Sequence, residues 1–385
     1  MNGSFRIGSL FGIPIYIHWT FLVVIPLFAW IIGTQIALTV GIITGSYNFV
    51  FGWLHPFEVD TSLFALGLYS YVLGALIALG LFGGVLIHEV AHSVVARHYG
   101  LKINSITLLI FGGVSSIEEG TPDPRVELPV ALVGPLTSCL VAILCSGIAY
   151  ASDIFIADRA VASTLIFFFG YLGLLNFILF VFNLLPAFPM DGGRVLRAWL
   201  ARSRPLPDAT RIAANIGKAF AVIFGIIAII VLNPILIIIA FFIYIGAGQE
   251  ENALRYNFLL KDVTVGDMMS RPVAIVPPDM PVHEVINQMY ASKHLGFPVA
   301  ERGVLIGMIT VADVHKRSPI DRDALQVRDI MTREIITLPP GAPVIDALRI
   351  MTVQNIGRIP VIDNNELVGI VTRTDILKVI ELKEV

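Results

Sequence analysis

Long stretches without a charged side chain fill the first two thirds of this 385-residue sequence. No Asp, Glu, Lys or Arg occurs in residues 7–57, and residues 63–87 are equally free of charge. A helix needs about 20 apolar residues to cross a bilayer, so both stretches are long enough to span a membrane. Charged residues are spread throughout the sequence after Glu250. We therefore expect a membrane part followed by a soluble part.

The composition agrees with this division and excludes several classes of function. The chain is 56% hydrophobic and 14% charged, with a mean hydropathy of +0.81, far from an average soluble protein. The net charge of −3 gives no indication of nucleic-acid binding. Two cysteines, Cys139 and Cys145, are too few for a disulfide framework and lie in an apolar segment. We expect both to pack in the membrane part.

Six membrane spans are predicted from hydropathy, at about residues 18–44, 64–98, 126–151, 161–183, 210–232 and 234–248. Residues 5–17, before the first span, can form a small hairpin. Basic residues crowd the loops after the second and fourth spans, at Arg97, Lys102, Arg125, Arg194, Arg197, Arg202, Arg204 and Arg211. Because cytoplasmic loops carry excess Lys and Arg, we expect a multi-pass protein of the cell membrane with both termini in the cytoplasm.

A short segment between the second and third predicted spans does not fit a spanning helix. Residues 103–117 read as two strands around Gly112 and Gly113, followed by Val114. Open sheet edges cannot face lipid, so such a hairpin must be buried in protein or line a cavity. Its free edge could receive an extended peptide by strand addition. The alternative is an ordinary interfacial loop.

The motif His88-Glu89-Val90-Ala91-His92 ends the second predicted span. Residues four apart share one helix face, so both imidazoles can bind one zinc ion while Glu89 acts as a general base. Ionisable groups at membrane depth are costly and are read as functional by default. A chance match on a solvated helix is disfavoured because the flanking residues are apolar. A metal-transport site is the competing interpretation.

A second group of chemically distinctive residues follows the fourth predicted span, from Asn183 to Arg194. Pro186 and Pro189 stand too close together for a regular helix, so the backbone must be extended inside protein. Asp191 can supply a third zinc ligand, which leaves a fourth position for water, as in catalytic sites. The alternative role for Asp191 is a helix N-cap.

These two motifs together resemble the site-2 protease family of intramembrane zinc metalloproteases. The resemblance implies that His88, His92 and Asp191 bind zinc and that Glu89 activates water. It also implies that Asn183 steadies the oxyanion. The hairpin at Gly112, Gly113 and Val114 resembles the membrane-inserted sheet that aligns substrate in this family. The short loop around residues 151–160 leaves no room for a PDZ domain.

The C-terminal part contains an internal repeat with an offset of 62 residues. Residues 265–269 align with 327–331, and Met289 aligns with Met351. The triplet Gly307, Thr310 and Asp313 aligns with Gly369, Thr372 and Asp375. Two such copies can bury each other's apolar faces. We expect a membrane domain at 1–250, a linker at 251–261, and repeats at 262–318 and 325–385.

The two repeats resemble cystathionine-β-synthase (CBS) domains, in which G-x-x-T-x-x-D recurs. The resemblance makes an adenine nucleotide a candidate ligand in the cleft between the copies. Asp313 and Asp375 could accept hydrogen bonds from a ribose, with Thr310 and Thr372 near a helix start where phosphate is favoured. CBS pairs also associate, so a homodimer is a candidate assembly. The alternative is a dimerisation module without a ligand.

The predicted fold is therefore a polytopic α-helical membrane domain with a membrane-associated β-hairpin, followed by an α/β tandem CBS pair. The predicted function is zinc-dependent cleavage of single-pass transmembrane substrates, with one zinc ion per chain and membrane lipid around the helices. Two rivals remain open: a membrane metal transporter with a cytoplasmic CBS sensor, and a catalytically dead scaffold. The presence of all three ligands and the base argues against the scaffold.

Overall fold

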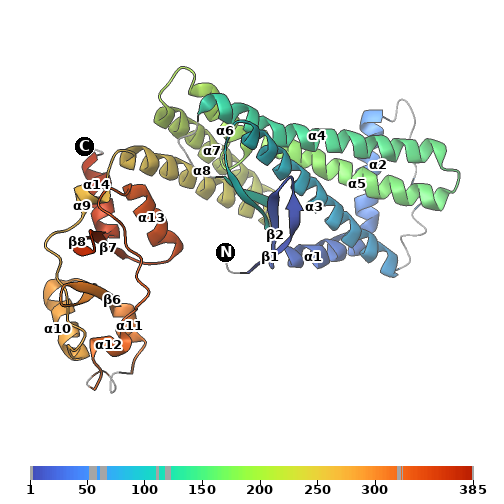
Figure 1. The fold of residues 1–385 in the computed structure, drawn as a ribbon. Helices are drawn as coiled ribbons and strands as arrows, with labels where there is room; N and C mark the ends of the chain where they lie inside the picture. The colour runs from blue at the N-terminus through green and yellow to red at the C-terminus, as the bar shows by residue number, and fades with distance from the viewer. Residues whose placement is uncertain are drawn as a thin grey trace. The chain divides into compact units, whose positions relative to one another are not determined.

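The chain forms two compact units, Met1–Asn252 and Ala253–Val385 (Figure 1). The structure is a computed structural model, and it describes residues 3–51, 59–60, 67–109, 112–117, 123–318, 322 and 324–383. Each unit has a hydrophobic core of its own.

The first unit is built mainly from helices: α1 (Phe21–Thr34), α2 (Ile36–Phe51), α3 (Gly67–His98), α4 (Pro124–Phe155), α5 (Arg159–Asn183), α6 (Asp191–Leu200), α7 (Leu206–Ile230) and α8 (Pro234–Leu260). Five helices in the described part of the chain, α3, α4, α5, α7 and α8, are long and apolar enough to cross a membrane. The number rises to six, as predicted, if the bent pair α1 and α2 is one span. The protein is therefore a multi-pass membrane protein.

The first predicted span, residues 18–44, is not one straight helix. The backbone of Gln35 leaves the helical region, with φ −118° and ψ 28°, and ends α1. The following helix is bent from α1 by 83°. Hydropathy alone could not reveal this break, because residues on both sides of it are apolar.

The sixth predicted span, residues 234–248, is shorter than the helix that contains it. Helix α8 continues without a break to Leu260. The segment predicted as a linker, residues 251–261, is therefore helical up to Leu260, and the boundary between the two compact units falls inside α8, after Asn252.

Both predicted hairpins are present, and they join into one sheet. The strands β1 (Ser4–Leu10), β2 (Ile13–His18), β3 (Ile103–Leu109) and β4 (Gly112–Ile117) lie in the order β1-β2-β3-β4. The central pair, β2 and β3, is parallel, with Ile15 opposite Ile106. Both of these side chains are buried, which anchors the sheet to the helices. The alternative of an irregular interfacial loop at 103–117 is therefore wrong.

The second unit contains α9 (Val265–Met268), α10 (Val282–Ser292), β5 (Gly296–Glu301), β6 (Val304–Thr310), α11 (Val311–His315), α12 (Val327–Ile330), α13 (Val344–Val353), β7 (Arg358–Asp363), β8 (Glu366–Thr372) and α14 (Arg373–Lys383). The predicted repeat is visible in the strand register. Gly296 pairs with Thr310 in β5–β6, and Arg358 pairs with Thr372 in β7–β8, again 62 residues apart.

Each repeat completes the core of the other. Val265 and Met269, at the start of the first repeat, are buried among residues of the second repeat such as Val344. Val327 and Ile330, at the start of the second repeat, are buried in the core of the first. The two copies therefore fold as one unit. The last turn of α8 also contributes to the core of the second repeat, where Leu260 is fully buried.

Candidate active site

Two imidazoles and a carboxylate converge inside the first unit. His88 and His92 lie on one face of α3 and are 4% and 7% exposed. Their Nε2 atoms stand 3.0 Å apart. Asp191, the first residue of α6, brings Oδ2 to 3.2 Å from His88 Nε2 and 3.1 Å from His92 Nε2. The three residues predicted as a ligand set form a group that could hold a metal ion.

The hydrogen bonds around this group fit a metal ion. His92 Nδ1 lies 2.7 Å from the Val130 carbonyl oxygen, which can only accept, so Nδ1 carries the proton. In the tautomer with its proton on Nδ1, His92 turns the lone pair of Nε2 toward Asp191 and His88, an arrangement that fits a shared cation. Tetrahedral zinc with bonds of about 2.0–2.1 Å spaces its ligands roughly 3.3 Å apart. The observed spacing is slightly tighter than that value.

Helix α4 supports both histidines, a role that the sequence analysis missed. Val130 accepts from His92, and Ser138 Oγ lies 2.9 Å from His88 Nδ1. Gly134 stands between them on the same face, and a Cβ there would lie 2.1 Å from His92 Nε2. A side chain at this position would enter the ligand cluster. The only sequence signal is the four-residue spacing of a glycine and a serine in an apolar helix.

Glu89 contacts the neighbouring strand β4. Ser115 Oγ donates to Glu89 Oε2 at 2.7 Å, and Ser93 Oγ donates to Ser115 Oγ at 3.2 Å. A Cβ on Gly113 would lie 2.2 Å from Glu89 Cγ, so only glycine allows this approach. The predicted base and the predicted substrate strand are therefore side by side. Ser93 and Ser115 were not predicted.

The strand β4 has an open edge beside Glu89. It pairs with β3 on one side and has no strand partner on the other among the described residues. Gly112 opens the strand with a φ of +135°, and the Val114 side chain is half exposed. Pairing of an extended peptide with this edge stays a prediction.

The loop before Asp191 turns sharply against its own helix. A Cβ on Gly192 would lie 2.2 Å from the Leu185 oxygen, and one on Gly193 would lie 2.6 Å from the Phe188 nitrogen. The N-cap of α6 is Met190, and the Asp191 carboxylate faces the imidazoles instead. The alternative role of Asp191 as a helix cap is therefore wrong.

Asn183 closes α5, and its side chain is engaged locally. Its Nδ2 donates to the Leu179 carbonyl one turn earlier, at 3.0 Å. Among the described residues, the Asn183 side chain makes no hydrogen bond to the ligand cluster. The role of Asn183 at an oxyanion stays a prediction, and it requires this bond to be exchanged.

The four residues predicted to bind nucleotide form two helix caps. Asp313 Oδ2 accepts from the Thr310 nitrogen at 3.1 Å and from its hydroxyl at 2.7 Å. Asp375 and Thr372 repeat this arrangement at 3.0 and 2.7 Å. The T-x-x-D signature therefore has a structural role in the fold, and its predicted contact with a ribose stays a prediction.

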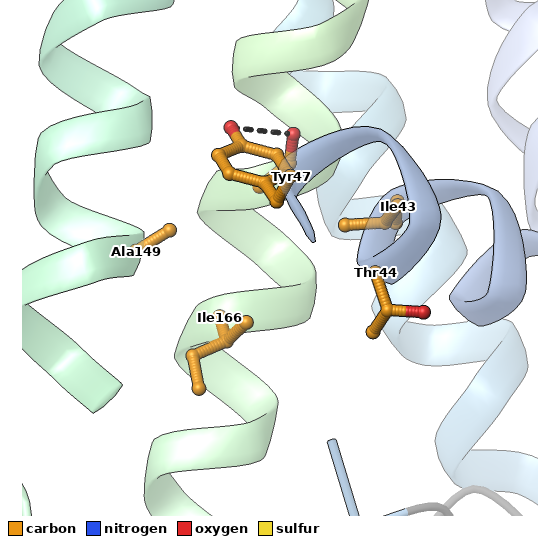
Figure 2. Close-up of a pocket in the computed structure, with 6 residues that line it drawn as sticks. Ile43, Thr44, Tyr47, Ala149 and Ile166 are labelled. Atoms are coloured by element: carbon orange, nitrogen blue, oxygen red, sulfur yellow. Dashed lines mark hydrogen bonds between the residues drawn. The ribbon is translucent and has the colours of Figure 1, made fainter. Parts of the chain in front are cut away.

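A small apolar cleft between α2, α4 and α5 is separate from the ligand cluster (Figure 2). The side chains of Ile43, Thr44, Tyr47 and Ile166 line it, and the Tyr47 hydroxyl donates to the Gly170 oxygen at 3.3 Å. None of its lining residues is a predicted site residue.

Comparisons with known proteins agree with this geometry. The sequence matches Peptidase family M50 over residues 76–224 and the CBS domain over 265–319 and 327–382. It is 34% identical to a zinc metalloprotease of Methanocaldococcus jannaschii over 100% of this chain and 99% of that protein. It is 29% identical to the protein Rip3 of Mycobacterium tuberculosis, covering 99% of this chain and 94% of that protein.

A solved structure of a site-2 protease from Methanocaldococcus jannaschii is 35% identical in sequence. The match covers 64% of this chain and 95% of that chain, with a TM-score of 0.40. The full-length sequence similarity, together with the ligand cluster on α3 and α6, shows that this chain belongs to the site-2 protease family of intramembrane zinc metalloproteases, with a tandem CBS pair at its C-terminal end.

Proposed function

We propose that His88, His92 and Asp191 hold one zinc ion and that Glu89 is the general base for peptide-bond hydrolysis in single-pass membrane proteins. The observation that carries this assignment is the convergence of three ligand atoms from α3 and α6, two of them on buried histidines, with Glu89 one residue from the first ligand. Bound zinc would lower the pKa of water and so supply a nucleophile at neutral pH.

The chain's own residues account for the remaining steps. Glu89, held by Ser115, accepts the proton of the attacking water and delivers it to the leaving amine. A helical substrate hides its carbonyl groups, so it must unwind locally before attack. The open edge of β4 at Gly112, Gly113 and Val114 supports the unwound segment by strand addition next to Glu89. Asn183 would donate to the oxyanion once released from Leu179.

A metal transporter with a CBS sensor is the alternative. It would use the same His and Asp ligands but gives Glu89 no separate role. It also requires further ligands along a path through the bilayer. In the described part of the chain, His88, His92 and Asp191 are the single such group found. The hydrogen bond that aims Glu89 at β4 favours the protease.

The experiment that tests the protease assignment is co-expression with candidate single-pass membrane proteins. The native chain should cleave its substrate, and Glu89→Gln should not, because an amide cannot accept the proton. Glu284→Gln, an exposed Glu on the first repeat, is the matched control and should cleave like the native chain. Equal cleavage by Glu89→Gln and the control would overturn the assignment of the base.

We also propose that the CBS pair binds an adenine nucleotide and so regulates cleavage. Arg358 supports an anionic ligand: its Nη1 donates to the Gly296 carbonyl, and a Cβ on Gly296 would touch both Arg358 and Thr310. Burial lowers the pKa of Arg358, a direction expected for a guanidinium that gains little from neighbouring carboxylates. A phosphate near Thr310 would compensate this charge.

The cytoplasmic location of the CBS pair belongs to the same proposal. It is supported by the basic residues of the loops around α6, among them Arg202 and Arg204. A cytoplasmic CBS pair would meet adenine nucleotides directly, and it could form the predicted homodimer.

A further inference from the structure

A group of four charged side chains lies behind the loop that presents Asp191. We call Arg194, Arg197, Glu127 and Glu250 the charge cluster. Arg197, on α6, is 4% exposed; its Nε donates to Glu127 Oε1 of α4 at 2.9 Å, and its Nη2 donates to the same carboxylate. Arg197 Nη1 lies 3.5 Å from Glu250 of α8, and Arg194 Nη2 lies 3.6 Å from that carboxylate.

The charge cluster is joined to the loop by direct packing. The Arg197 guanidinium lies 5.0 Å from the ring centre of Phe188, which is fully buried three residues before Asp191. Helix α8 also forms a wall of the loop, since a Cβ on Gly246 would lie 2.8 Å from Pro189. A movement of α6 against α8 would therefore shift the position of Asp191.

The balance of charge shows what Glu250 contributes. A buried guanidinium must be paired, and Glu127 pairs with Arg197. Arg194 is a second cation one turn earlier on α6, and it is paired by Glu250. Without the Glu250 charge, Arg194 and Arg197 would both lose their ion pair with α8.

We infer that Arg197 and Glu250 are positioning residues for Asp191: their contacts across α4, α6 and α8 hold its carboxylate in reach of both histidines. The inference rests on the proposed role of Asp191 as a zinc ligand. Loss of a group that orients a metal ligand typically costs 10–100-fold in metal affinity or activity. We expect the lower end of that range for Glu250, because it acts through two arginines.

The neighbouring residue on α8 provides a matched control. Glu251 accepts from Lys218 of α7 at 2.7 Å, and its side chain is 25% exposed, close to the 29% of Glu250. Glu251→Gln and Glu250→Gln therefore remove the same charge, from adjacent residues of one helix, with similar exposure. Only Glu250 contacts the helix that begins at Asp191.

The experiment measures zinc retention by the full-length protein in detergent against a graded zinc chelator. Glu250→Gln should lose zinc at a free-zinc concentration about tenfold higher than the native chain does. Glu250→Asp should recover part of this loss because it keeps the charge. Glu251→Gln should retain zinc like the native chain. In zinc-saturated protein, Glu250→Gln should lower kcat with little change in KM.

Two outcomes separate this inference from the ligand assignment. If Asp191→Ala loses zinc while Glu250→Gln retains it like Glu251→Gln, the positioning role is wrong and the ligand assignment stands. If Asp191→Ala itself retains zinc, the ligand assignment fails first. Equal losses from Glu250→Gln and Glu251→Gln would show a general effect of charge on α8, which also contradicts the inference.

Discussion

At the scale of single residues, the ligand cluster depends on the lack of a side chain at Gly134. Gly134 lets α4 approach the two imidazoles, while Val130 and Ser138 on the same face fix their Nδ1 atoms. Groups that orient metal ligands determine which nitrogen faces the metal. The residues of α4 that contact His88 and His92 are therefore part of the metal site, as the ligands themselves are.

Substitution of Gly134 should test this dependence. A Cβ on Gly134 would lie 2.1 Å from His92 Nε2 and 2.7 Å from His88 Nε2, so Gly134→Ala should abolish zinc binding and cleavage. Gly147→Ala, on the same helix with nothing within 4 Å, is the control. It should leave zinc content unchanged and stabilise α4 by up to about 1 kcal/mol. Full zinc occupancy in Gly134→Ala, measured by elemental analysis, would contradict the packing described.

The hydrogen bond from Ser115 offers a second test at this scale. Ser115→Ala removes the hydrogen-bond donor to Glu89 and should lower kcat roughly tenfold. A hydrogen bond to a charged group contributes about 1.4 kcal/mol or more, and a barrier higher by about 1.4 kcal/mol slows a reaction tenfold. Zinc content should not change, because Ser115 does not contact a ligand. Ser105→Ala on β3 is the control. An unchanged kcat in Ser115→Ala would show that Glu89 needs no support from β4.

At the scale of elements, the sequence predicted what is local and missed what depends on packing. The pairing of His88 with His92 follows from helical periodicity, and both hairpins follow from turn residues in apolar segments. The roles of Val130, Gly134 and Ser138 require the crossing of α3 and α4, which no local pattern encodes. The break at Gln35 and the continuation of α8 to Leu260 were missed because hydropathy measures polarity and carries no information on helix direction.

The T-x-x-D signature was found from the repeat, but its helix-capping role emerged from the structure. Asp267 forms the same kind of cap with Thr264 outside the signature, and the hydrogen bonds from Thr264 hold the pKa of its carboxyl below the ordinary value. Asp313→Asn and Asp267→Asn should therefore both weaken a helix start. Only Asp313→Asn should weaken binding of AMP, ADP or ATP in calorimetry of the full chain. Equal nucleotide binding by the two variants would show that Asp313 caps its helix and does not contact the nucleotide.

At the scale of the whole molecule, α8 is the element shared by both units. Residues around Gly246 and Glu250 pack on the loop before Asp191, and Leu260 lies in the core of the second repeat, where Lys383 donates to the Leu259 oxygen. The end of α8 thus precedes the first repeat in the sequence but packs in the core of the second repeat. A nucleotide can regulate cleavage only if it binds one conformation better than another.

This arrangement predicts how regulation would depend on α8. If a nucleotide changes the cleavage rate of the full-length protein, Glu250→Gln should reduce that change, and Glu251→Gln should preserve it. Nucleotide binding with no effect on the native cleavage rate would remove the regulatory role and leave a binding site.

The topology is a separate prediction at this scale. Single cysteines at Ser203 and Ser318, introduced after replacing Cys139 and Cys145, should be labelled from the cytoplasmic side by a membrane-impermeant thiol reagent. A cysteine at Ser62, which lies outside the described residues, should be labelled from the opposite side. Labelling of Ser318 from outside intact cells would overturn the orientation inferred from the basic loops.

The most direct test of the central claim is zinc content and peptide cleavage measured on the same purified preparations. His88→Ala, His92→Ala and Asp191→Ala should each lose zinc and activity together, because each removes one of three converging ligands. Glu89→Gln should keep one zinc ion per chain and lose cleavage. Full zinc occupancy in Asp191→Ala, or near-native cleavage by Glu89→Gln, would contradict the account.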